Sequence, residues 1–146
     1  MIDKKHIGME LPTVVWPVER GRLLAFANAI GEQRPEYIDE AAARAAGYRG
    51  LLAPPTLWLA PQFDADTVML MLAALDVPIE RLLHGEQSFT YSAPVCAGDV
   101  LTLKAKVADI VDKKGGAMEL ITHRTTVTNQ RGETVGEMSS VLVVRN

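Results

Sequence analysis

A carboxylate and a phenol that could take part in acid–base chemistry stand five positions apart, Glu32 and Tyr37. Proton transfer in catalysis needs paired groups whose pKa values lie near the working pH. A tyrosine has a reference pKa of about 10, roughly 3.5 units above that of histidine, so Tyr37 is a poor base near neutral pH. Arg34 stands between the two residues, and a nearby cation lowers the basicity of a carboxylate. Glu32 and Tyr37 are therefore candidate catalytic residues, although their residue types disfavour proton transfer. The alternatives are that Glu32 is a solvated charge and that Tyr37 is a packing aromatic residue.

A further candidate is His84, which is followed by Gly85, Glu86 and Gln87. We expect this segment to be a strand, and a glycine within a strand allows a ligand to approach the backbone closely. His84 is therefore a candidate catalytic residue, and Gly85 and Gln87 are candidate substrate-binding residues. The alternative is that His84 is a hydrogen-bonded structural residue of the sheet. His123 lies in a threonine-rich segment and is expected on the surface.

The sequence contains no spacing that predicts a metal site or a nucleotide cofactor. The three histidines lie far apart, there is one cysteine, and no glycine-rich phosphate loop is present. The net charge is −3, and the chain has no basic run of the kind that marks nucleic-acid-binding proteins. We therefore expect no metal, no cofactor and no nucleic-acid partner.

The bulk composition predicts one globular domain that spans residues 1–146. Apolar residues make up 48% of the chain, which argues against disorder. The lone Cys96 excludes an intrachain disulfide, fits a reducing compartment and is expected to be a small buried hydrophobe. The most apolar run, 68–75, is far shorter than the roughly 20 residues of a membrane helix, and the first residues contain no signal-peptide core. The resulting prediction is a cytoplasmic protein without membrane contact.

Helical spacing dominates the first half of the chain. Apolar residues recur on one face over 23–30, which predicts an amphipathic helix with Pro17 in its first turn and Gly31 at its end. Asp39 is the expected N-cap of a short helix over 40–46.

A wholly apolar segment follows over 51–60, interrupted by two prolines. A helix without a polar face belongs inside a protein, so the residues after the prolines predict a buried helix. Pro61 should end or kink this helix. Another helix is expected over 67–75, with Asp66 as its N-cap.

Strand patterns dominate the second half. Apolar and polar residues alternate over 101–107, as in a half-buried strand. Turns at 112–116 and 129–133 separate this strand from its successors. Such short connections favour an antiparallel meander, so the pattern alone predicts an α+β fold in which an antiparallel sheet covers a helix. The other expected strands are 9–15, 82–91, 118–128 and one that ends at 141–144.

The segment 26–43 resembles the catalytic loop of the MaoC-like dehydratases and (R)-specific enoyl-CoA hydratases. Gly31 and Pro35 match the family's Gly-Asp and Asn-Pro frame. The functional positions differ, because the family has Asp, Asn and His where this chain has Glu32, Arg34 and Tyr37.

Two further regions support the resemblance. The segment 89–99 is similar to the family's aromatic-x-x-Pro-Val-x-x-Gly-Asp sequence, in which Gly98–Asp99 is expected to form a structural turn. The segments 51–56 and 83–87 resemble the non-catalytic N-terminal half of the family, which also occurs in the dehydratase region of fungal-type fatty-acid synthases.

The resemblance implies a hot-dog fold, in which an antiparallel sheet wraps around a long apolar helix, and pairing with a second hot-dog chain. The family adds water to a trans-2-enoyl thioester or removes it, with an Asp and a His as acid–base pair. Backbone N–H groups at a helix N-terminus can hold the thioester oxygen. Here such donors would lie near Pro55–Leu57, although Pro54 and Pro55 have no N–H. The implied substrate-binding residues of this region are Pro55, Thr56, Leu57 and Trp58.

Three hypotheses follow, each with an acyl-CoA or acyl-carrier-protein thioester as ligand and a homodimer or heterodimer as assembly. In the first, the chain holds the acyl group along 51–56 and 67–75 while a partner hot dog supplies the Asp and His, as in fatty-acid metabolism. In the second, it is a self-sufficient hydratase that uses Glu32 or His84. In the third, it is a non-catalytic acyl-CoA-binding module. A thioesterase is disfavoured because 57–60 contains no acidic residue.

Overall fold

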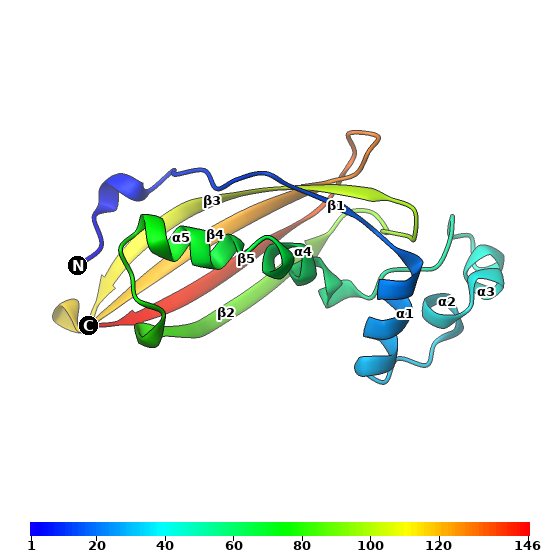
Figure 1. Cartoon of the computed structure of the whole chain (residues 1–146), viewed down its shortest axis with the longest axis horizontal. Coiled ribbons are helices and arrows are strands. Elements are labelled where there is room, and N and C mark those ends of the chain that lie inside the picture. Colours follow the sequence, from blue (N-terminus) through cyan, green and yellow to red (C-terminus); the bar gives the residue numbers. More distant parts are fainter.

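A computed structural model describes residues 1–146, and its centre is a five-stranded antiparallel sheet with the strand order β1-β3-β4-β5-β2 (Figure 1). The three longest strands follow one another in the chain as a meander, as the turn signals predict. The alternation of buried and exposed residues along β3 and β4 places every second side chain on the helix side of the sheet. The strands are β1 Val14–Pro17, β2 Leu82–Tyr91, β3 Val100–Lys113, β4 Met118–Thr128 and β5 Thr134–Arg145.

The N-terminal segment is less regular than the strand predicted over 9–15. Only β1 is a strand, and before it Glu10 makes an isolated bridge to Lys106. Pro12 lies between the two and has no N–H to donate to the ladder, which explains the interruption. Pro17 ends β1 opposite Val100 and is not in the first turn of the following helix, so that prediction was wrong.

Three short helices, α1 Arg20–Ala29, α2 Pro35–Ile38 and α3 Glu40–Ala45, form a lobe beyond one end of the sheet (Figure 1). Asp39 caps α3 as predicted, because its carboxylate accepts a hydrogen bond from the N–H of Ala41 at 2.8 Å. The lobe carries the segment that resembles a catalytic loop, so it decides where Glu32 and Tyr37 lie.

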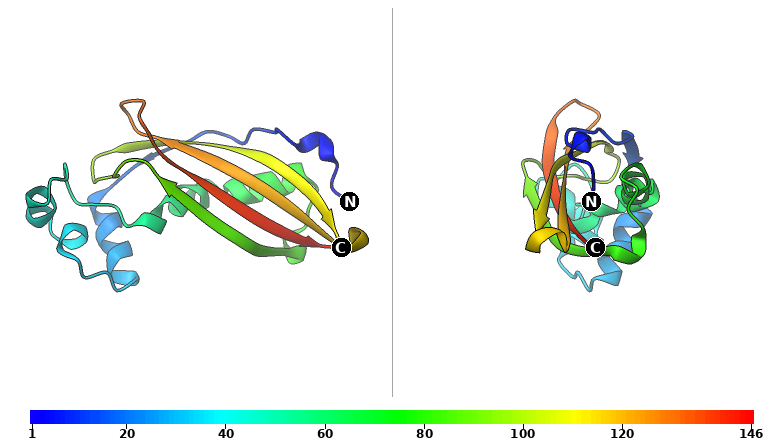
Figure 2. Two further views of the ribbon diagram at one scale, coloured as in Figure 1. Left: turned by 180° about the vertical axis from the view of Figure 1, so that it is seen from behind. Right: turned by 90° about the vertical axis from the view of Figure 1, so that its left-hand side faces the viewer.

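The apolar segment is not the single long helix that the resemblance implied. It consists of a 3-10 helix η2 Pro55–Leu59, then α4 Ala60–Asp64 and α5 Thr67–Ala74. Pro61 lies in the first turn of α4, where a missing N–H costs nothing, and the helix after the prolines, η2, ends at Leu59 just before it. Asp66 has φ 50° and breaks the helix between α4 and α5, but its side chain makes no capping hydrogen bond. Figure 2, in its end-on view, shows these helices along one face of the sheet.

Two apolar clusters fill the space between the helices and the sheet, and a polar strip separates them. The strip comprises the buried residues Gln62, His123, Thr125 and Ser140, with the exposed Gln87 at its edge. Within it, Gln62 donates to the Thr125 hydroxyl at 2.7 Å and the Ser140 hydroxyl donates to Gln87. His123 is 2% exposed and neither ring nitrogen has a hydrogen-bond partner, so the prediction of a surface histidine was wrong.

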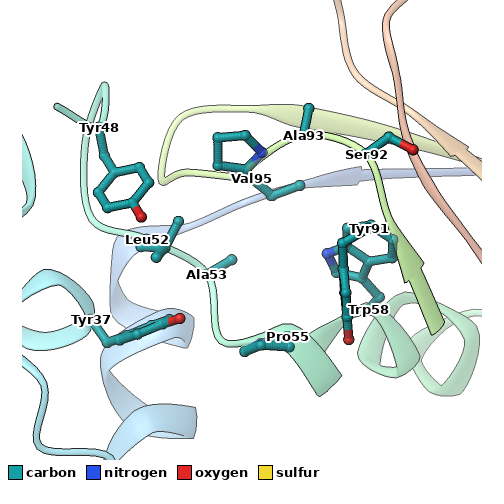
Figure 3. Close-up of a pocket in the computed structure, with 11 residues that line it drawn as sticks. Tyr37, Tyr48, Leu52, Ala53, Pro55, Trp58, Tyr91, Ser92, Ala93 and Val95 are labelled. Atoms are coloured by element: carbon teal, nitrogen blue, oxygen red, sulfur yellow. The ribbon is translucent and has the colours of Figure 1, made fainter.

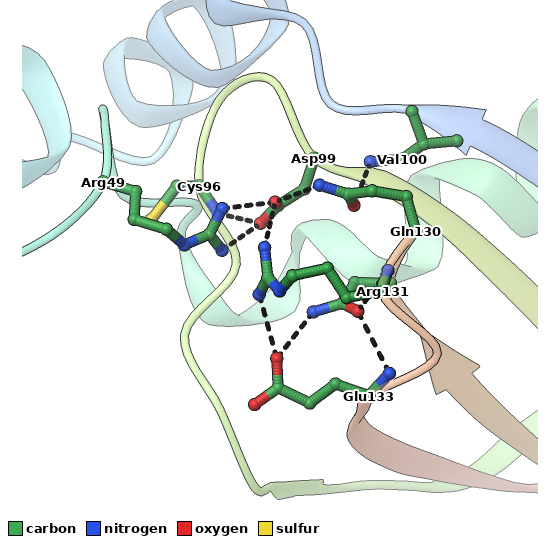
Figure 4. A network of polar contacts seen from close by, with 8 residues as sticks. Arg49, Cys96, Asp99, Val100, Gln130, Arg131 and Glu133 are labelled. Carbon is green, nitrogen blue, oxygen red and sulfur yellow. Dashed lines mark hydrogen bonds and ion pairs between the residues drawn. The ribbon is translucent and has the colours of Figure 1, made fainter.

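Asp99 is the buried anchor of the turn before β3 (Figure 4). It accepts hydrogen bonds from Arg49 at 2.7 and 2.8 Å, from the N–H of Cys96 at 2.9 Å and from Gln130 at 3.1 Å. Burial alone would raise the pKa of Asp99, but these donors outweigh burial and hold the pKa below its usual value. Gly98 has φ +90°, which confirms a structural turn, and Cys96 is buried as expected.

The smaller elements are three 3-10 turns. They are η1 Lys4–His6, η3 Ile79–Arg81 and η4 Lys114–Gly116, the last of which joins β3 to β4. None of the helices has both the length and the apolar character that a membrane crossing requires.

Candidate functional site

A cavity of about 320 Å³ lies where the helical lobe meets η2 and the end of β2 (Figure 3). We call it the aromatic cavity, because three tyrosines and a tryptophan line it together with small apolar residues. Its walls contain no carboxylate, imidazole or amine. The lining residues are Tyr37, Tyr48, Leu52, Ala53, Pro55, Trp58, Tyr91, Ser92, Ala93, Pro94 and Val95.

Tyr37 forms the lobe side of the cavity, where Figure 3 shows its hydroxyl pointing inward. The short helix α2 begins at Pro35, whose fixed φ suits a first turn, and so carries Tyr37 toward the cavity. The ring is 6% exposed, and the guanidinium of Arg34 lies 4.6 Å from its centre in a cation–π contact. Burial raises the pKa of Tyr37, although the charge of Arg34 opposes this effect. Near neutral pH the Tyr37 hydroxyl is therefore a hydrogen-bond donor and not a base.

Trp58 and Tyr91 form the opposite wall (Figure 3). Their ring centroids are 4.9 Å apart in an edge-on arrangement, and Phe89 stacks on Tyr91 at 5.9 Å. Burial also raises the pKa of Tyr91, and Tyr37 contributes to that rise. Both phenols therefore present neutral hydroxyls to the aromatic cavity.

Glu32 does not line the cavity. Its carboxylate accepts hydrogen bonds from Nη2 and Nε of Arg34 at 2.8 and 3.1 Å, and from the N–H groups of Arg34 and Gln33. The hydrogen bonds from the Arg34 side chain, followed by that from its backbone N–H, lower the pKa of Glu32 to about 2. As expected from the sequence, Arg34 removes the basicity of this carboxylate, which stays ionised throughout the neutral range.

The candidates on β2 lie in a different part of the molecule from Tyr37. His84 and Gln87 are exposed, and His84 is seven residues from Tyr91, roughly 23 Å along an extended strand. A Cβ on Gly85 would lie 3.0 Å from the carbonyl oxygen of Val141 and from a methyl carbon of Val143. Gly85 therefore permits close packing against β5 at a bulge, which accounts for a glycine here without a ligand; that it admits a ligand stays a prediction.

Of the four residues predicted around η2, the structure places Pro55 and Trp58 in the aromatic cavity. Thr56 is exposed outside it and Leu57 is buried in the core. The N–H of Leu57 donates to the carbonyl of Pro54 at 3.1 Å, so this donor is not free to hold a thioester oxygen. Likewise the helix α5, predicted as part of the acyl groove, contributes no residue to the cavity.

Sequence reasoning missed the phenols Tyr48 and Tyr91 as wall residues. Tyr91 stands inside the quoted 89–99 segment, and Tyr48 directly follows the glycine that ends the α3 segment, so both adjoin recognised features. The structure contains no group of three or more residues that could hold a metal ion. An apolar cavity with neutral hydroxyls suits a hydrocarbon group attached to a polar carbonyl, and it lacks a proton-transferring pair.

Residues 5–138 match the model of the family described as "FAS1-like, dehydratase domain region". The chain belongs to this family. The match covers most of the chain and includes every lining residue of the aromatic cavity.

Individual relatives agree with this assignment. A UPF0336 protein of Streptomyces avermitilis is 34% identical over 145 residues, which cover 99% of this chain and 95% of that protein. The C-terminally truncated HadBC (3R-hydroxyacyl-ACP dehydratase) complex of Mycobacterium tuberculosis contains a chain with a TM-score of 0.81 and 25% identity, over 94% of this chain and 96% of that chain. A MaoC-like dehydratase has a TM-score of 0.85 and 27% identity, over 97% of this chain and 42% of that chain. The hot-dog fold and the MaoC-like resemblance are thus confirmed.

Proposed function

We propose that this chain is the acyl-holding subunit of an (R)-specific enoyl-thioester hydratase or 3-hydroxyacyl-thioester dehydratase. The aromatic cavity receives the acyl group, and a second hot-dog chain supplies the catalytic Asp and His. The observation that carries the proposal is the aromatic cavity itself, which is lined by one residue of the segment 26–43 that resembles the family's catalytic loop, the neutral phenol Tyr37. The carboxylate at the position where the family has Asp, Glu32, does not line the cavity and is hydrogen-bonded to Arg34.

Substrate binding and proton transfer are separate requirements of the reaction, so two different chains can meet them. Dehydration removes a proton from the α-carbon and a hydroxide from the β-carbon, so it requires a base and an acid close to the same pair of carbons. The altered loop offers neither near neutral pH, because Glu32 has a pKa of about 2 and the pKa of Tyr37 is raised. The contributions of this chain are to bind the apolar part, to exclude water and to donate a hydrogen bond from the Tyr37 hydroxyl to an oxygen of the ligand.

The edge strand β2 supports the presence of a partner. It is ten residues long, contains no proline and has one unpaired edge, which is a template for pairing with another strand. Leu83 and Tyr91, both on this strand, are 46% and 47% exposed. Tyr91 also lines the aromatic cavity, so a chain docked along β2 would bring its own residues to the rim of the cavity.

The relatives fit a two-chain arrangement. One structural neighbour is a chain of a complex, and another is a chain more than twice as long, of which this protein spans 42%. A site shared between two hot-dog units is consistent with both.

The test is to purify the chain alone and to supply crotonyl-CoA and longer enoyl-CoAs. We expect no substantial hydration by the chain alone, and full turnover after addition of a hot-dog chain with an intact Asp and His. Within the complex, Tyr37→Phe should weaken turnover because it removes the hydroxyl, whereas Glu32→Gln should not. Full turnover by the chain alone that is lost in Glu32→Gln or His84→Gln would instead establish a self-sufficient hydratase. Saturable acyl-CoA binding without turnover, with every partner supplied, would leave a binding module.

A further inference from the structure

Trp58 separates the aromatic cavity from the apolar interior of the protein. It lines the cavity, yet it is only 3% exposed. The same side chain belongs to a buried cluster that includes Leu57 and Met138, with Phe89 packed against it. One part of the indole therefore faces the cavity, and the rest faces a region of apolar side chains between η2 and the sheet.

A notch in the sheet fixes the indole in this position. Gly136 on β5 has no side chain, and a Cβ built there would lie 2.5 Å from Cη2 and 2.6 Å from Cζ3 of Trp58. Those distances are far below van der Waals contact, so the ring occupies space that only a glycine leaves open. Tyr91, which also lines the cavity, packs against the ring in a T-shaped arrangement at a centroid distance of 4.9 Å. With backbone behind it and an aromatic ring in front, the indole has no room to swing aside.

We propose that Trp58 is the residue that sets acyl-chain length, because it closes the inner end of the aromatic cavity, and that the ligand is accordingly a short-chain acyl thioester. The inference rests on the proposed function, since it assumes that the cavity receives an acyl group. The volume of about 320 Å³ lies at the low end of the roughly 300–1,000 Å³ typical of ligand sites. A smaller residue at position 58 would join the cavity to the apolar region around Met138 and Phe89 and so lengthen it.

The experiment measures the affinity of the full-length chain for CoA and for acetyl-, butyryl-, hexanoyl-, octanoyl- and decanoyl-CoA by isothermal titration calorimetry. Each methylene that becomes buried raises affinity by about fourfold. For the wild type we expect this gain to stop at hexanoyl-CoA. In Trp58→Leu and Trp58→Met it should continue for about two further methylenes, which raises the ratio of decanoyl- to hexanoyl-CoA affinity about 15-fold.

Matched controls separate chain length from stability. Trp58→Phe keeps an aromatic wall and should shift the length limit less than Trp58→Leu. Phe63→Leu changes an exposed aromatic residue of α4 that does not line the cavity, and it should keep the wild-type profile. Circular dichroism and a thermal melt establish that each variant is folded.

The possible outcomes distinguish this inference from the proposed function. If the wild type binds decanoyl-CoA tighter than hexanoyl-CoA by the full factor per methylene, Trp58 does not close the cavity, whatever the variants do. An unchanged profile in folded Trp58→Leu or Trp58→Met overturns the inference as well, while acyl binding itself stands. If no acyl-CoA binds the wild type better than CoA, the proposed function fails first.

Discussion

Replacement of His123 by leucine should stabilise the protein, and more strongly in acid. His123 lies in the middle of β4, opposite Val107 on one side and Ser140 on the other, with 2% of its surface exposed. Neither ring nitrogen has a hydrogen-bond partner. A buried polar group without a partner costs about 1–3 kcal/mol, and an apolar group of similar size removes that cost. At pH 8 we therefore expect His123→Leu to raise the free energy of unfolding by about 1–3 kcal/mol, or to raise Tm by about 2–4 °C for each kcal/mol.

The pH dependence follows from the same burial. Desolvation lowers the pKa of His123 from its usual value of 6.5, and the charge of the neighbouring His84 lowers it further. Below pH 6.5 the unfolded chain consequently binds a proton that the folded chain does not. The stability of the wild type is therefore fully present above pH 6.5 and falls as the pH decreases toward the lowered value, by at most about 1.4 kcal/mol per pH unit. His123→Leu should lose this component of the decline.

Urea unfolding at pH 8 and at pH 5 measures both effects, with unchanged m-values as the sign that the unfolded state is comparable. Glu32 and Asp99 do not obscure this window, because their lowered pKa values place their titration below it. The exposed His84, changed to Gln, is the matched control and should leave most of the decline in place. Parallel stability curves for wild type and His123→Leu between pH 8 and pH 5 would refute the argument, since a buried neutral histidine cannot be replaced without changing the proton balance.

Three further predictions concern the turn, the sheet and the altered loop. Asp99→Ala should cost about 1–3 kcal/mol in urea unfolding, because it leaves the buried N–H of Cys96 without its acceptor; a loss below 1 kcal/mol would contradict this. Gly136→Ala should cost at least about 1–3 kcal/mol in the same assay, since its Cβ would lie 2.2 Å from a backbone oxygen, and a stabilising effect would show that the notch is not tight. Arg34→Gln should raise the pKa of Glu32 from about 2 toward its usual 4.5, as measured by carboxyl chemical shifts against pH; an unchanged pKa would exclude Arg34 as the cause.

The sequence predicted those elements whose signals are local. The Asp39 cap, the strand 82–91, the turn 112–116 and the turn 129–133 each depend on residues within a few positions, and all are present. The start of a helix at Thr67 with Asp66 before it was also predicted and is present, whereas the positive φ of Asp66 was not predicted, because that conformation is uncommon for a residue other than glycine.

The sequence did contain a signal that His123 points inward, but its residue type and the threonine-rich segment around it were given more weight. Ile121, Thr125 and Val127 share its face of β4, since side chains two residues apart point the same way. Two of these three neighbours are apolar and buried, so the period of the strand favoured an inward histidine. Residue type alone, in a threonine-rich segment, suggested the surface.

The aromatic cavity was only partly predictable, because its walls come from segments that are distant in the chain. Tyr37, Pro55 and Trp58 were named through their resemblance to family motifs, whereas Tyr48 was not. The close packing of Gly85 was not predicted for the same reason, since its contact is with β5, more than fifty residues later. A glycine within a strand is compatible both with close approach of a ligand and with close approach of another strand, so the sequence alone does not distinguish the two.

The three residues of the loop that differ from the family's pattern, Glu32, Arg34 and Tyr37, are connected through contacts of Arg34. Glu32 has the length to bend back and accept four hydrogen bonds from its own loop, two of them from the guanidinium of Arg34. The same guanidinium lies over the ring of Tyr37, so a single cation neutralises the carboxylate and packs against the phenol that lines the cavity. Arg34 thus contacts both of the other residues, and neither Glu32 nor Tyr37 is left as a base near neutral pH. The loop therefore keeps its internal contacts although it has no base near neutral pH. That combination is expected if, as proposed, the subunit holds a substrate while its partner performs the chemistry.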